Sequence, residues 1–404
     1  MQTVNRVERH IILKSHPMYQ IVDLYCYKSK NLYNYANYIV RQSFINENTY
    51  IPYNKLTYKI KHDEPFKDIG SNSGQHTLKI LHQNWKSYFA SIKDWSKNPA
   101  KYLGKPRLPN YLDKESGRFI WVLTNMQSKI VNQKLVFSFK PLKKYNGLFN
   151  TKVTGKHMQT RFIPKSSYYI MEIVYEIAVP IAKESSKRII GIDLGINNFA
   201  TIQNNFNEKP FVINGRKLKD INNFYNKELS RRKSVTMKTN KCHWSKKMQI
   251  LTDKRTNKID HYLHCCSKYI VDYCIAFKVD TVVIGYNKKW KQKSSLGATN
   301  QSFVSIPYQS FVNKMEYKLQ EAGIKLILTE ESYTSKASFL NNDPLIKGEY
   351  NGKRVKRGLY KTNEGTLINA DVNAAGNIIK KVFPKAFVDG IEGVGLHPVI
   401  VNVI

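Results

Sequence analysis

The order of hydrophobic patterns after residue 186 restricts the fold of this chain more than any other feature of its sequence. Short runs rich in β-branched and aromatic residues come first and predict successive strands at 188–194, 197–203 and 210–213. Long basic patterns with a helical period follow at 216–235 and 246–278. The remaining patterns alternate between strand and helix, at 281–284, 302–322, 324–329 and 371–382. Three strands followed by alternating helices and strands predict an α/β core.

The N-terminal half follows a different pattern. A strand pattern at 4–14 precedes helical patterns at 18–44 and 74–95, with a polar, irregular stretch between the two helices. Proline and glycine then mark a boundary at 99–110, after which the hydrophobic period changes to two. Strands are expected at 118–123, 134–140 and 168–177. We therefore predict a small β-barrel from 1–16 and 99–185, a helical insertion at 17–98, an RNase H-like α/β core at 186–385 and a tail at 386–404.

The chain is strongly basic. Its 404 residues include 65 Lys and Arg but only 30 Asp and Glu, a net charge of +35. Nucleic acid is the natural counter-charge for such a protein, and an anionic membrane surface is the rival. No stretch approaches 18 apolar residues, and the first residues lack the apolar core of a signal peptide. We therefore favour a nucleic-acid partner and expect no membrane association.

The five cysteines argue against a disulfide framework and a zinc ribbon, because their number is odd and no pair has the spacing of a C-x-x-C motif. A reducing cytoplasm fits this composition best. His261, His264 and Cys265 share one basic helical stretch, but an ordinary helix surface explains them better than a metal site. The chain has no phosphate-binding P-loop and no G-x-S-x-G elbow, which argues against ATPase and serine-hydrolase functions.

Acidic residues mark three places where a predicted element of the α/β core meets a loop. Asp193 interrupts an apolar strand between two glycines, and Asp371 opens the last helix. Glu330 and Glu331 close the strand at 324–329, and only one of them can face a shared site because side chains alternate along extended chain. Each acid alone also has an ordinary explanation, as a solvated residue at a strand end or as a helix N-cap. Together they can converge at one edge of the core.

Convergent carboxylates of this kind suit phosphodiester cleavage by two Mg²⁺ ions held about 4 Å apart. One ion activates the attacking water, and the other stabilises the leaving oxygen. Three or four carboxylates normally suffice as ligands. The strand at 281–284 is the natural source of a third, but it ends in Gly285, Tyr286 and Asn287 and supplies no acid.

At these residues the chain resembles the TnpB-type proteins of bacterial insertion sequences, an OrfB-like transposase family of RNA-guided DNA nucleases related to the type V CRISPR effectors. Gly-Ile-Asp-Leu-Gly at 191–195 matches their first RuvC motif, and Ala-Asp-Val-Asn-Ala-Ala-Gly-Asn-Ile at 370–378 matches the third. Tyr-Thr-Ser-Lys at 333–336 matches the segment that precedes their zinc finger. The helix around 85–89 and the junction at 104–107 fit the N-terminal half. The resemblance covers nearly the whole chain.

The resemblance implies a RuvC nuclease domain at 186–385, a wedge β-barrel, and a helical recognition insertion. It implies an endonuclease encoded by a transposable element, with Mg²⁺ as cofactor (Mn²⁺ in vitro) and a guide RNA from the element's own end. The expected target is double-stranded DNA with a short adjacent motif, and the expected location is the bacterial cytoplasm at the nucleoid. Asp193, Glu331 and Asp371 take the catalytic and metal-binding roles, with Glu330 in reserve. A guided repressor without cleavage and a strand-transfer transposase remain as alternatives.

Two positions depart from the family pattern. The second RuvC motif normally carries Glu where this chain has Gly285, but some branches place the acid before the Tyr-Thr-Ser segment, where Glu331 stands. The family's zinc finger has two cysteine pairs, whereas residues 337–369 contain no cysteine. We therefore expect no zinc and a degenerate finger at about 336–369.

Basic clusters interleaved with aromatic residues are the expected contacts to RNA and DNA backbones, although any one of them could be a solvated face. The candidates are Lys105, Arg107, Arg216, Lys217, Arg231, Arg232, Lys288, Lys289, Trp290, Lys291, Lys353, Arg354, Lys356 and Arg357.

Overall fold

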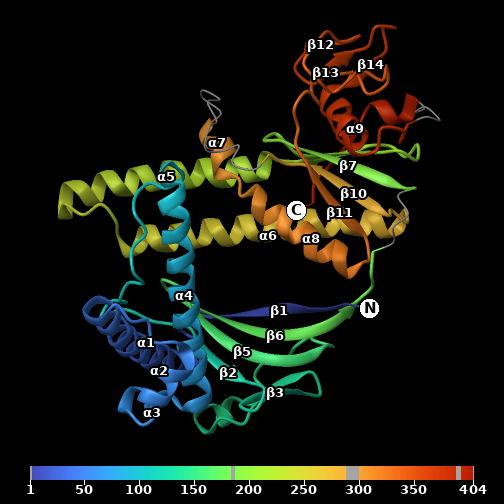
Figure 1. Ribbon diagram of the computed structural model, residues 1–404. Helices are drawn as coiled ribbons and strands as arrows, with labels where there is room; N and C mark the ends of the chain where they lie inside the picture. The colour runs from blue at the N-terminus through green and yellow to red at the C-terminus, as the bar shows by residue number, and fades with distance from the viewer. Residues whose placement is uncertain (1, 183–186, 288–299, 388–392, 404) are drawn as a thin grey trace. The chain divides into compact units, whose positions relative to one another are not determined.

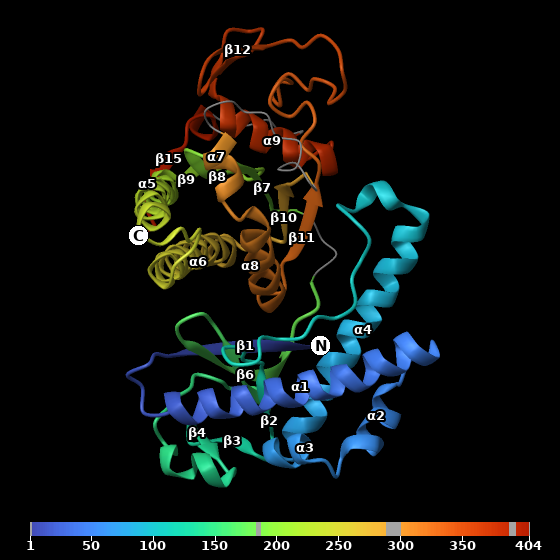
Figure 2. The same ribbon diagram turned by 90° about the vertical axis from the view of Figure 1, so that its left-hand side faces the viewer.

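The computed structural model describes residues 2–182, 187–287, 300–387 and 393–403, and the chain divides into two compact units. The N-terminal unit is Thr3–Ala178, and the C-terminal unit is Val179–Ile404 with the first two residues. Figures 1 and 2 show the units in two views. None of the helices in the described residues combines the length and the hydropathy needed to cross a bilayer.

The N-terminal unit joins helices to an antiparallel sheet. The helices are α1 (Tyr19–Glu47), α2 (Tyr53–Ile60), α3 (Glu64–Ile69) and α4 (Ser71–Lys97). The sheet has the order β1-β6-β5-β2, formed by β1 (Gln2–Ile12), β6 (Tyr169–Val179), β5 (Lys156–Pro164) and β2 (Trp121–Thr124). A separate hairpin pairs β3 (Ser128–Val131) with β4 (Lys134–Phe137), and short 3-10 helices lie at Pro99–Lys101 and Lys140–Tyr145.

The sequence prediction for this unit needs two corrections. In the residues that the structure describes, the strands form an open four-stranded sheet and a hairpin instead of the predicted barrel. The stretch expected to be irregular contains α2 and α3, which bury Leu56, Ile60 and Phe66. These helices have 8 and 6 residues, too few for a helical period to emerge from the sequence.

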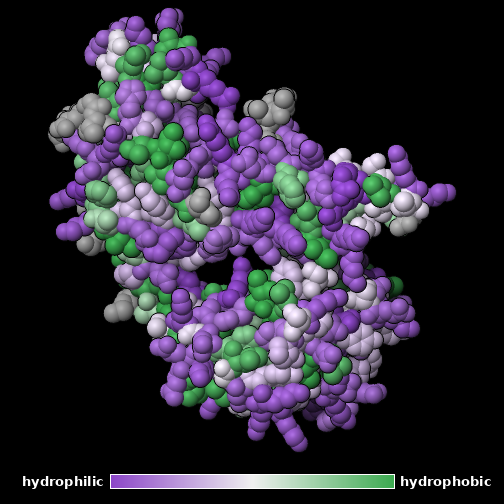
Figure 3. Space-filling model, turned by 180° about the vertical axis from the view of Figure 1, so that it is seen from behind, coloured by the Kyte–Doolittle hydropathy of each residue, from purple (hydrophilic) through white to green (hydrophobic). Residues whose placement is uncertain are grey.

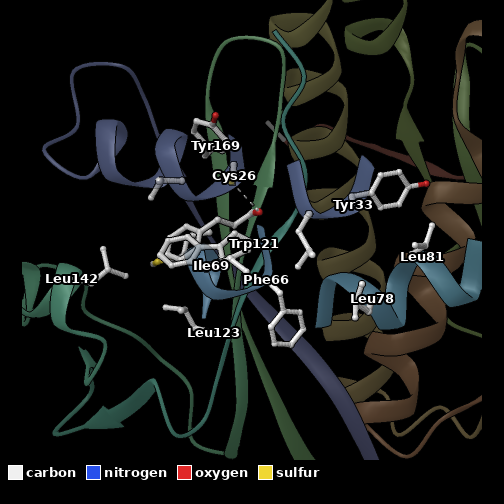
Figure 4. Close-up of a cluster of buried hydrophobic side chains, with 14 of the residues drawn as sticks. Cys26, Tyr33, Phe66, Ile69, Leu78, Leu81, Trp121, Leu123, Leu142 and Tyr169 are labelled. Carbon is white, nitrogen blue, oxygen red and sulfur yellow. Dashed lines mark hydrogen bonds between the residues drawn. The ribbon is translucent and has the colours of Figure 1, made fainter. Parts of the chain in front are cut away.

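Aromatic packing holds the helices of the N-terminal unit to its sheet. Trp121 is fully buried and stacks against Phe162 and Tyr25, with ring centroids 4.9 and 4.6 Å away. Its indole Nε1 donates to Ser73 Oγ on α4 at 3.2 Å, so the buried polar atom is paired. Figure 4 shows Trp121 among apolar side chains from both helices and strands, including Leu78.

The C-terminal unit is built on a six-stranded mixed sheet. Its order is β11-β10-β7-β8-β9-β15, with β7 antiparallel to β8, β8 antiparallel to β9, and β10 parallel to both β7 and β11. The strands are β7 (Ile189–Leu194), β8 (Asn198–Asn204), β9 (Phe211–Asn214), β10 (Thr281–Gly285), β11 (Lys325–Thr329) and β15 (Val399–Val401). This is the α/β core predicted from the order of the patterns.

Helices cover both faces of this sheet. They are α5 (Arg216–Asn240), α6 (Lys246–Ala276), α7 (Asn300–Ser305), α8 (Tyr308–Glu321) and α9 (Ala370–Val382). Ile190 and Ile192 of β7 share one apolar cluster with buried residues of α6 and α8, whereas Ile189 packs with Ile378 and Ile379 of α9 on the other face. Because side chains alternate along β7, Asp193 lies on the face of Ile189, which packs against α9. Figure 1 shows α9 beside β7.

Two segments of the C-terminal unit differ from the sequence prediction. The helix expected at 302–322 is divided into α7 and α8, with Pro307 between them. The predicted tail at 386–404 contributes β15, which pairs parallel with β9, and a 3-10 helix at Gly393–Leu396. The predicted finger region contains a small antiparallel sheet of β12 (Lys353–Lys356), β13 (Leu359–Lys361) and β14 (Leu367–Asn369).

A glycine lets α9 lie directly against β7. A Cβ atom at Gly191 would stand 2.3 Å from the backbone oxygen of Ala375 and 2.7 Å from Ile379 Cγ1. The obstructing oxygen is part of a helix backbone, so only a shift of the whole helix could relieve this contact. Gly191 therefore fixes the distance between the strand that carries Asp193 and the helix that carries Asp371.

We predict that Gly191→Ala lowers the free energy of unfolding of the protein by about 3 kcal/mol, at the upper end of ordinary overpacking. Urea denaturation, monitored by a spectroscopic signal that reports on the C-terminal unit, measures this change in the free energy of unfolding. Gly348→Ala is the matched control, because a Cβ atom at Gly348 meets nothing within 4 Å. Equal stability of the two variants would contradict the proposed close approach.

Candidate active site

Asp193 and Asp371 line one cleft of about 340 Å³ in the C-terminal unit. Asp193 comes from the end of β7, and Asp371 is the second residue of α9. The cleft is completed by the turn that follows β7 and by residues around β12, namely Gly195, Ile196, Asn197, Asn198, Arg354, Arg357 and Gly358. Elements more than 170 residues apart in the sequence thus contribute acids to a single hollow.

Hydrogen bonds fix the orientation of Asp371. The Asn369 side chain accepts from the backbone N–H groups of Asp371 and Val372, which caps α9. Asn198 Nδ2 donates to Asp371 Oδ2 at 2.6 Å, and the Arg354 guanidinium lies 3.7 Å from the other carboxylate oxygen. Asp371 therefore keeps one oxygen toward β8 and turns the other toward Arg354.

Asp193 occupies the most strongly perturbed position of the cleft. Burial raises its pKa well above the usual value, and the carboxylates of Glu331 and Asp371 raise it further. The Arg354 guanidinium acts in the opposite direction. Because Glu331 and Asp371 both disfavour the charged form of Asp193, a divalent cation placed beside these groups would stabilise it.

Glu331 fills the space that Gly285 leaves open. A Cβ atom at Gly285 would stand 2.7 Å from Glu331 Oε1, 2.8 Å from Glu331 Cγ and 2.6 Å from Ile378 Cδ1. Gly285 pairs with Thr329 in the parallel register of β10 and β11, and Glu331 follows two residues later. Its backbone N–H donates to Asn287 Oδ1 at 3.0 Å. The Glu331 side chain, from the chain that follows β11, thus lies against the end of β10.

Glu331 is half-buried, and its Oε1 is shielded from solvent and has no hydrogen-bond partner in the described part of the chain. Burial raises the pKa of Glu331 to about 7, with a smaller contribution from Glu330 and an opposing one from Lys381. An oxygen that is buried and unpaired beside two further acids is a free ligand position for a cation.

Glu330 points away from the other acids. It is 56% exposed and forms an ion pair with Lys381 on α9, and it also accepts from the Ser332 hydroxyl. Hydrogen bonds from Lys381 and Ser332 lower its pKa to about 2. The geometry therefore separates the two glutamates, as strand alternation requires.

Two asparagines of α9 anchor the chain that follows Glu331. Asn377 Nδ2 donates to the backbone oxygens of Thr334 and Ala337, at 2.9 and 2.7 Å. Asn373 Nδ2 donates to Ala337 O at 2.8 Å, and its Oδ1 accepts from the N–H of Phe339. Both side chains are fully buried. The helix that presents Asp371 thus also positions the segment that presents Glu331, a role that the motif alone did not reveal.

The donor set fits Mg²⁺. Carboxylate and amide oxygens are the hard ligands that Mg²⁺ prefers, and the unpaired Glu331 oxygen offers one directly. Within the residues described, no group of three His, Cys, Asp or Glu side chains is already arranged to hold a metal ion. Side-chain rotation would be needed to close the ligand set.

Comparisons with known proteins show what the chain is similar to. Residues 172–291 match the OrfB_IS605 family, described as a probable transposase, and residues 308–378 match the Cas12f1-like TNB domain. The TnpB-like protein ORF457 of Acidianus two-tailed virus is 22% identical over 386 residues, which cover 87% of this chain and 81% of that protein.

Cas12f1 proteins are also similar to the chain. The CRISPR-associated endodeoxyribonuclease Cas12f1 of Sulfoacidibacillus thermotolerans is 26% identical over 241 residues, 56% of this chain and 53% of that protein. A Cas12f1 structure solved with its guide RNA and target DNA has a TM-score of 0.53 at 16% identity, covering 89% of this chain and 82% of that one. The chain is thus similar both to a TnpB-like protein and to Cas12f1 proteins. The structural likeness extends over both units.

The basic residues predicted to contact nucleic acid differ in their exposure and in their ion pairs. Lys105, Arg107, Arg216 and Lys217 are exposed, whereas Arg231 and Arg232 both bind Glu228, at 2.8 and 2.6 Å. The predicted contacts at Lys288, Lys289, Trp290 and Lys291 lie outside the described residues. Lys353, Arg354, Lys356 and Arg357 are exposed around β12, and Arg354 and Arg357 line the cleft. The sequence missed that these two arginines face the acids.

Hydrophilic side chains cover most of the surface seen in Figure 3, and hydrophobic patches between them are small. The histidines and cysteine singled out on α6 have local partners. Cys265 Sγ lies 3.9 Å from His261, and His264 lies 3.6 Å from Asp260, which also binds Lys314. These contacts join residues of α6 to one another and to α8.

We predict that the metal-free protein loses stability as the pH rises from about 4.5 to 7. A carboxyl group whose pKa is raised in the folded state binds its proton more tightly there, so its contribution is full below the unfolded pKa and disappears through the folded pKa. Glu331, with a pKa near 7, contributes up to about 3 kcal/mol to this change, and Asp193 adds to it. Urea denaturation at several pH values measures the slope.

Glu331→Gln should flatten this dependence, because glutamine does not titrate. Glu330→Gln is the matched control: the pKa of Glu330 is lowered to about 2, so this group stays charged over the whole range. The same slope in the wild type and in Glu331→Gln would contradict the assigned burial of Glu331.

Proposed function

We propose that this protein is an RNA-guided, Mg²⁺-dependent DNA endonuclease encoded by a transposable element. The proposal rests on the cleft that Asp193 and Asp371 share, and on the rise in the pKa of Asp193 that burial, Glu331 and Asp371 cause. The TnpB-type and Cas12f1 relatives, one of them named an endodeoxyribonuclease, support the same reaction class.

In this proposal, Asp193, Glu331 and Asp371 hold Mg²⁺, with Glu331 Oε1 as the unpaired oxygen that a cation would satisfy. When bound, Mg²⁺ supplies Lewis acidity and an activated water for hydrolysis of a phosphodiester. Asn198 keeps Asp371 oriented through its 2.6 Å hydrogen bond. Arg354 and Arg357 bind the substrate phosphate at the mouth of the cleft, and Arg354 exchanges its contact with Asp371 for the phosphate.

Guide RNA and double-stranded target DNA are the proposed partners. A net charge of +35 suits binding to two polyanions, and a Cas12f1 relative of known structure was solved with guide RNA and target DNA. We propose that the RNA comes from the end of the element itself and that the DNA carries a short motif beside the target.

A pocket of about 380 Å³ in the N-terminal unit suits a nucleotide of that motif. It lies between α2 and α4 and combines an aromatic ring, amides and ammonium groups, from Pro52, Tyr53, Asn54, Lys79, His82, Gln83 and Lys86. Burial and Lys86 lower the pKa of His82, so its ring is neutral near pH 7. Tyr53 offers a stacking face, Asn54 and Gln83 offer base-edge hydrogen bonds, and the two lysines offer phosphate contacts.

We predict that Asp193→Ala, Glu331→Ala and Asp371→Ala each slow cleavage of a guide-matched plasmid by on the order of 10³-fold, because each removes a metal ligand. RNA and DNA affinities should stay within about threefold of the wild type. Plasmid cleavage with co-purified RNA, in Mg²⁺ and in EDTA, measures the rate. Filter binding measures the RNA and DNA affinities.

Glu330→Ala is the matched control, since Glu330 faces Lys381, and it should cleave within about threefold of the wild-type rate. Wild-type rates in the Asp193 or Asp371 variants would overturn the assignment. Joining of donor DNA to a target would favour the strand-transfer alternative, which the probable-transposase family match supports. Guided binding without any cleavage would favour a repressor.

We predict that Tyr53→Ala weakens binding to target DNA by about 5- to 100-fold, the cost of one lost stacking contact, and relaxes the choice of adjacent motif. Lys79→Ala should lower the slope of log affinity against log salt by about 1. Tyr58, 75% exposed on the same helix and outside the pocket, provides the control Tyr58→Ala. Equal effects of the two tyrosine variants would count against the pocket.

A further inference from the structure

The segment from Ala337 to Gly352 takes the place of a zinc-binding loop, yet it is ordered by a carboxylate. It contains no cysteine and no histidine, so the zinc site that the resemblance implies at this place does not fit the residues present. It also lies beside the cleft in sequence, since β12 with Arg354 begins at Lys353. Its order therefore needs another physical cause.

Asp343 provides that cause. Its side chain is only 3% exposed, and its carboxylate accepts from the N–H of Ser338 at 2.7 Å. The same carboxylate accepts from Asn351 Nδ2 at 2.7 Å and from the N–H of Asn351 at 3.2 Å. One buried anion thus joins positions 338 and 351, the two ends of the loop, as a metal ion would join two ligand pairs.

Contacts with α9 tie this loop to the nuclease core. Phe339, directly after Ser338, donates its N–H to Asn373 Oδ1. Lys380 of α9 is 7% exposed, and its Nζ makes no hydrogen bond to any described residue. Burial lowers the pKa of Lys380, and the Asp343 carboxylate partly offsets that effect. The buried anion therefore has a buried cation on the helix that carries Asp371.

The far end of the loop leads into the strand that faces the acids. Asn351, held by Asp343, lies three residues before Arg354, whose guanidinium reaches Asp371. The buried Tyr360 of β13 donates its hydroxyl to Lys336 O at 2.9 Å, which closes the small sheet against the start of the loop. Asp343 is thus the central acceptor of a network that ends at the cleft.

We propose that Asp343 replaces the structural metal of this region and is a positioning residue that holds β12, and with it Arg354, over the candidate active site. Its effect on cleavage rests on the proposed function, whereas its effect on the order of the loop does not. The segment then folds without zinc and responds to removal of one carboxylate.

Hydrogen exchange on the full-length protein tests whether Asp343 orders the loop. Asp343→Asn keeps the shape but removes the charge that accepts from three N–H donors, so exchange of peptides within 338–356 should rise about 10- to 100-fold. Asn351→Ala removes one side-chain hydrogen bond and should give a smaller rise at the same peptides. Glu349→Gln removes an equal charge from an exposed position of the same loop and should change nothing.

A zinc chelator, or added zinc, should leave wild-type exchange in 338–356 unchanged. Slower exchange with zinc, or unchanged exchange in both Asp343→Asn and Asn351→Ala, would overturn the proposal. These measurements need no nuclease activity, so they test the role of Asp343 in ordering the loop even if the wild type does not cleave DNA.

A double-mutant cycle with Arg354→Ala tests whether Asp343 positions Arg354. The measured quantity is the single-turnover cleavage rate. If Asp343 acts through Arg354, Asp343→Asn slows the wild type at least tenfold but changes the Arg354→Ala variant by less than about twofold. Independent, multiplying effects would show that Asp343 stabilises the protein without positioning Arg354. Rates measured at saturating DNA separate this effect from weaker binding.

Discussion

The close packing of α9 on β7 is the contact on which the candidate active site depends. Gly191 allows the backbone of Ala375 to come within reach of the strand, and a side chain at this position would push the helix away. The same helix presents Asp371, anchors the segment after Glu331 through Asn373 and Asn377, and packs against Ile189. The relative positions of the acids are therefore set by one helix–strand contact, and the loops only complete them.

Electrostatics at this contact opposes the fold. Asp193 is half-buried beside two further acids, and both of them raise its pKa. Such a cluster is expected where a cation normally compensates the charge, because stability alone would favour apolar residues. The Arg354 guanidinium of β12, which reaches Asp371 and lowers the pKa of Asp193, compensates only in part, since Arg354 is nearly half exposed.

Sequence reasoning predicted the α/β core well because strands and helices of this length carry clear periods. It also predicted that Asp193 and Asp371 lie close together, since both stand at the ends of strongly patterned elements. It could not predict that α2 and α3 are helical, because each is too short to show a period, nor that the strands of the N-terminal unit stay open. The roles of Asn373, Asn377 and Asp343 were hidden because they depend on contacts between segments far apart in the chain.

Alternation along extended chain implies that only one of Glu330 and Glu331 can face a shared site, but it does not say which. Packing makes that choice. The Glu331 side chain, which follows β11, fills the volume that a side chain at Gly285 of β10 would need, so the two residues depend on each other. When segments are exchanged between related proteins, Gly285 and Glu331 must consequently be exchanged together. A graft that carries a glutamate at the end of β10 beside a resident Glu331 would crowd the hollow, and the reciprocal graft would leave the hollow without its acid.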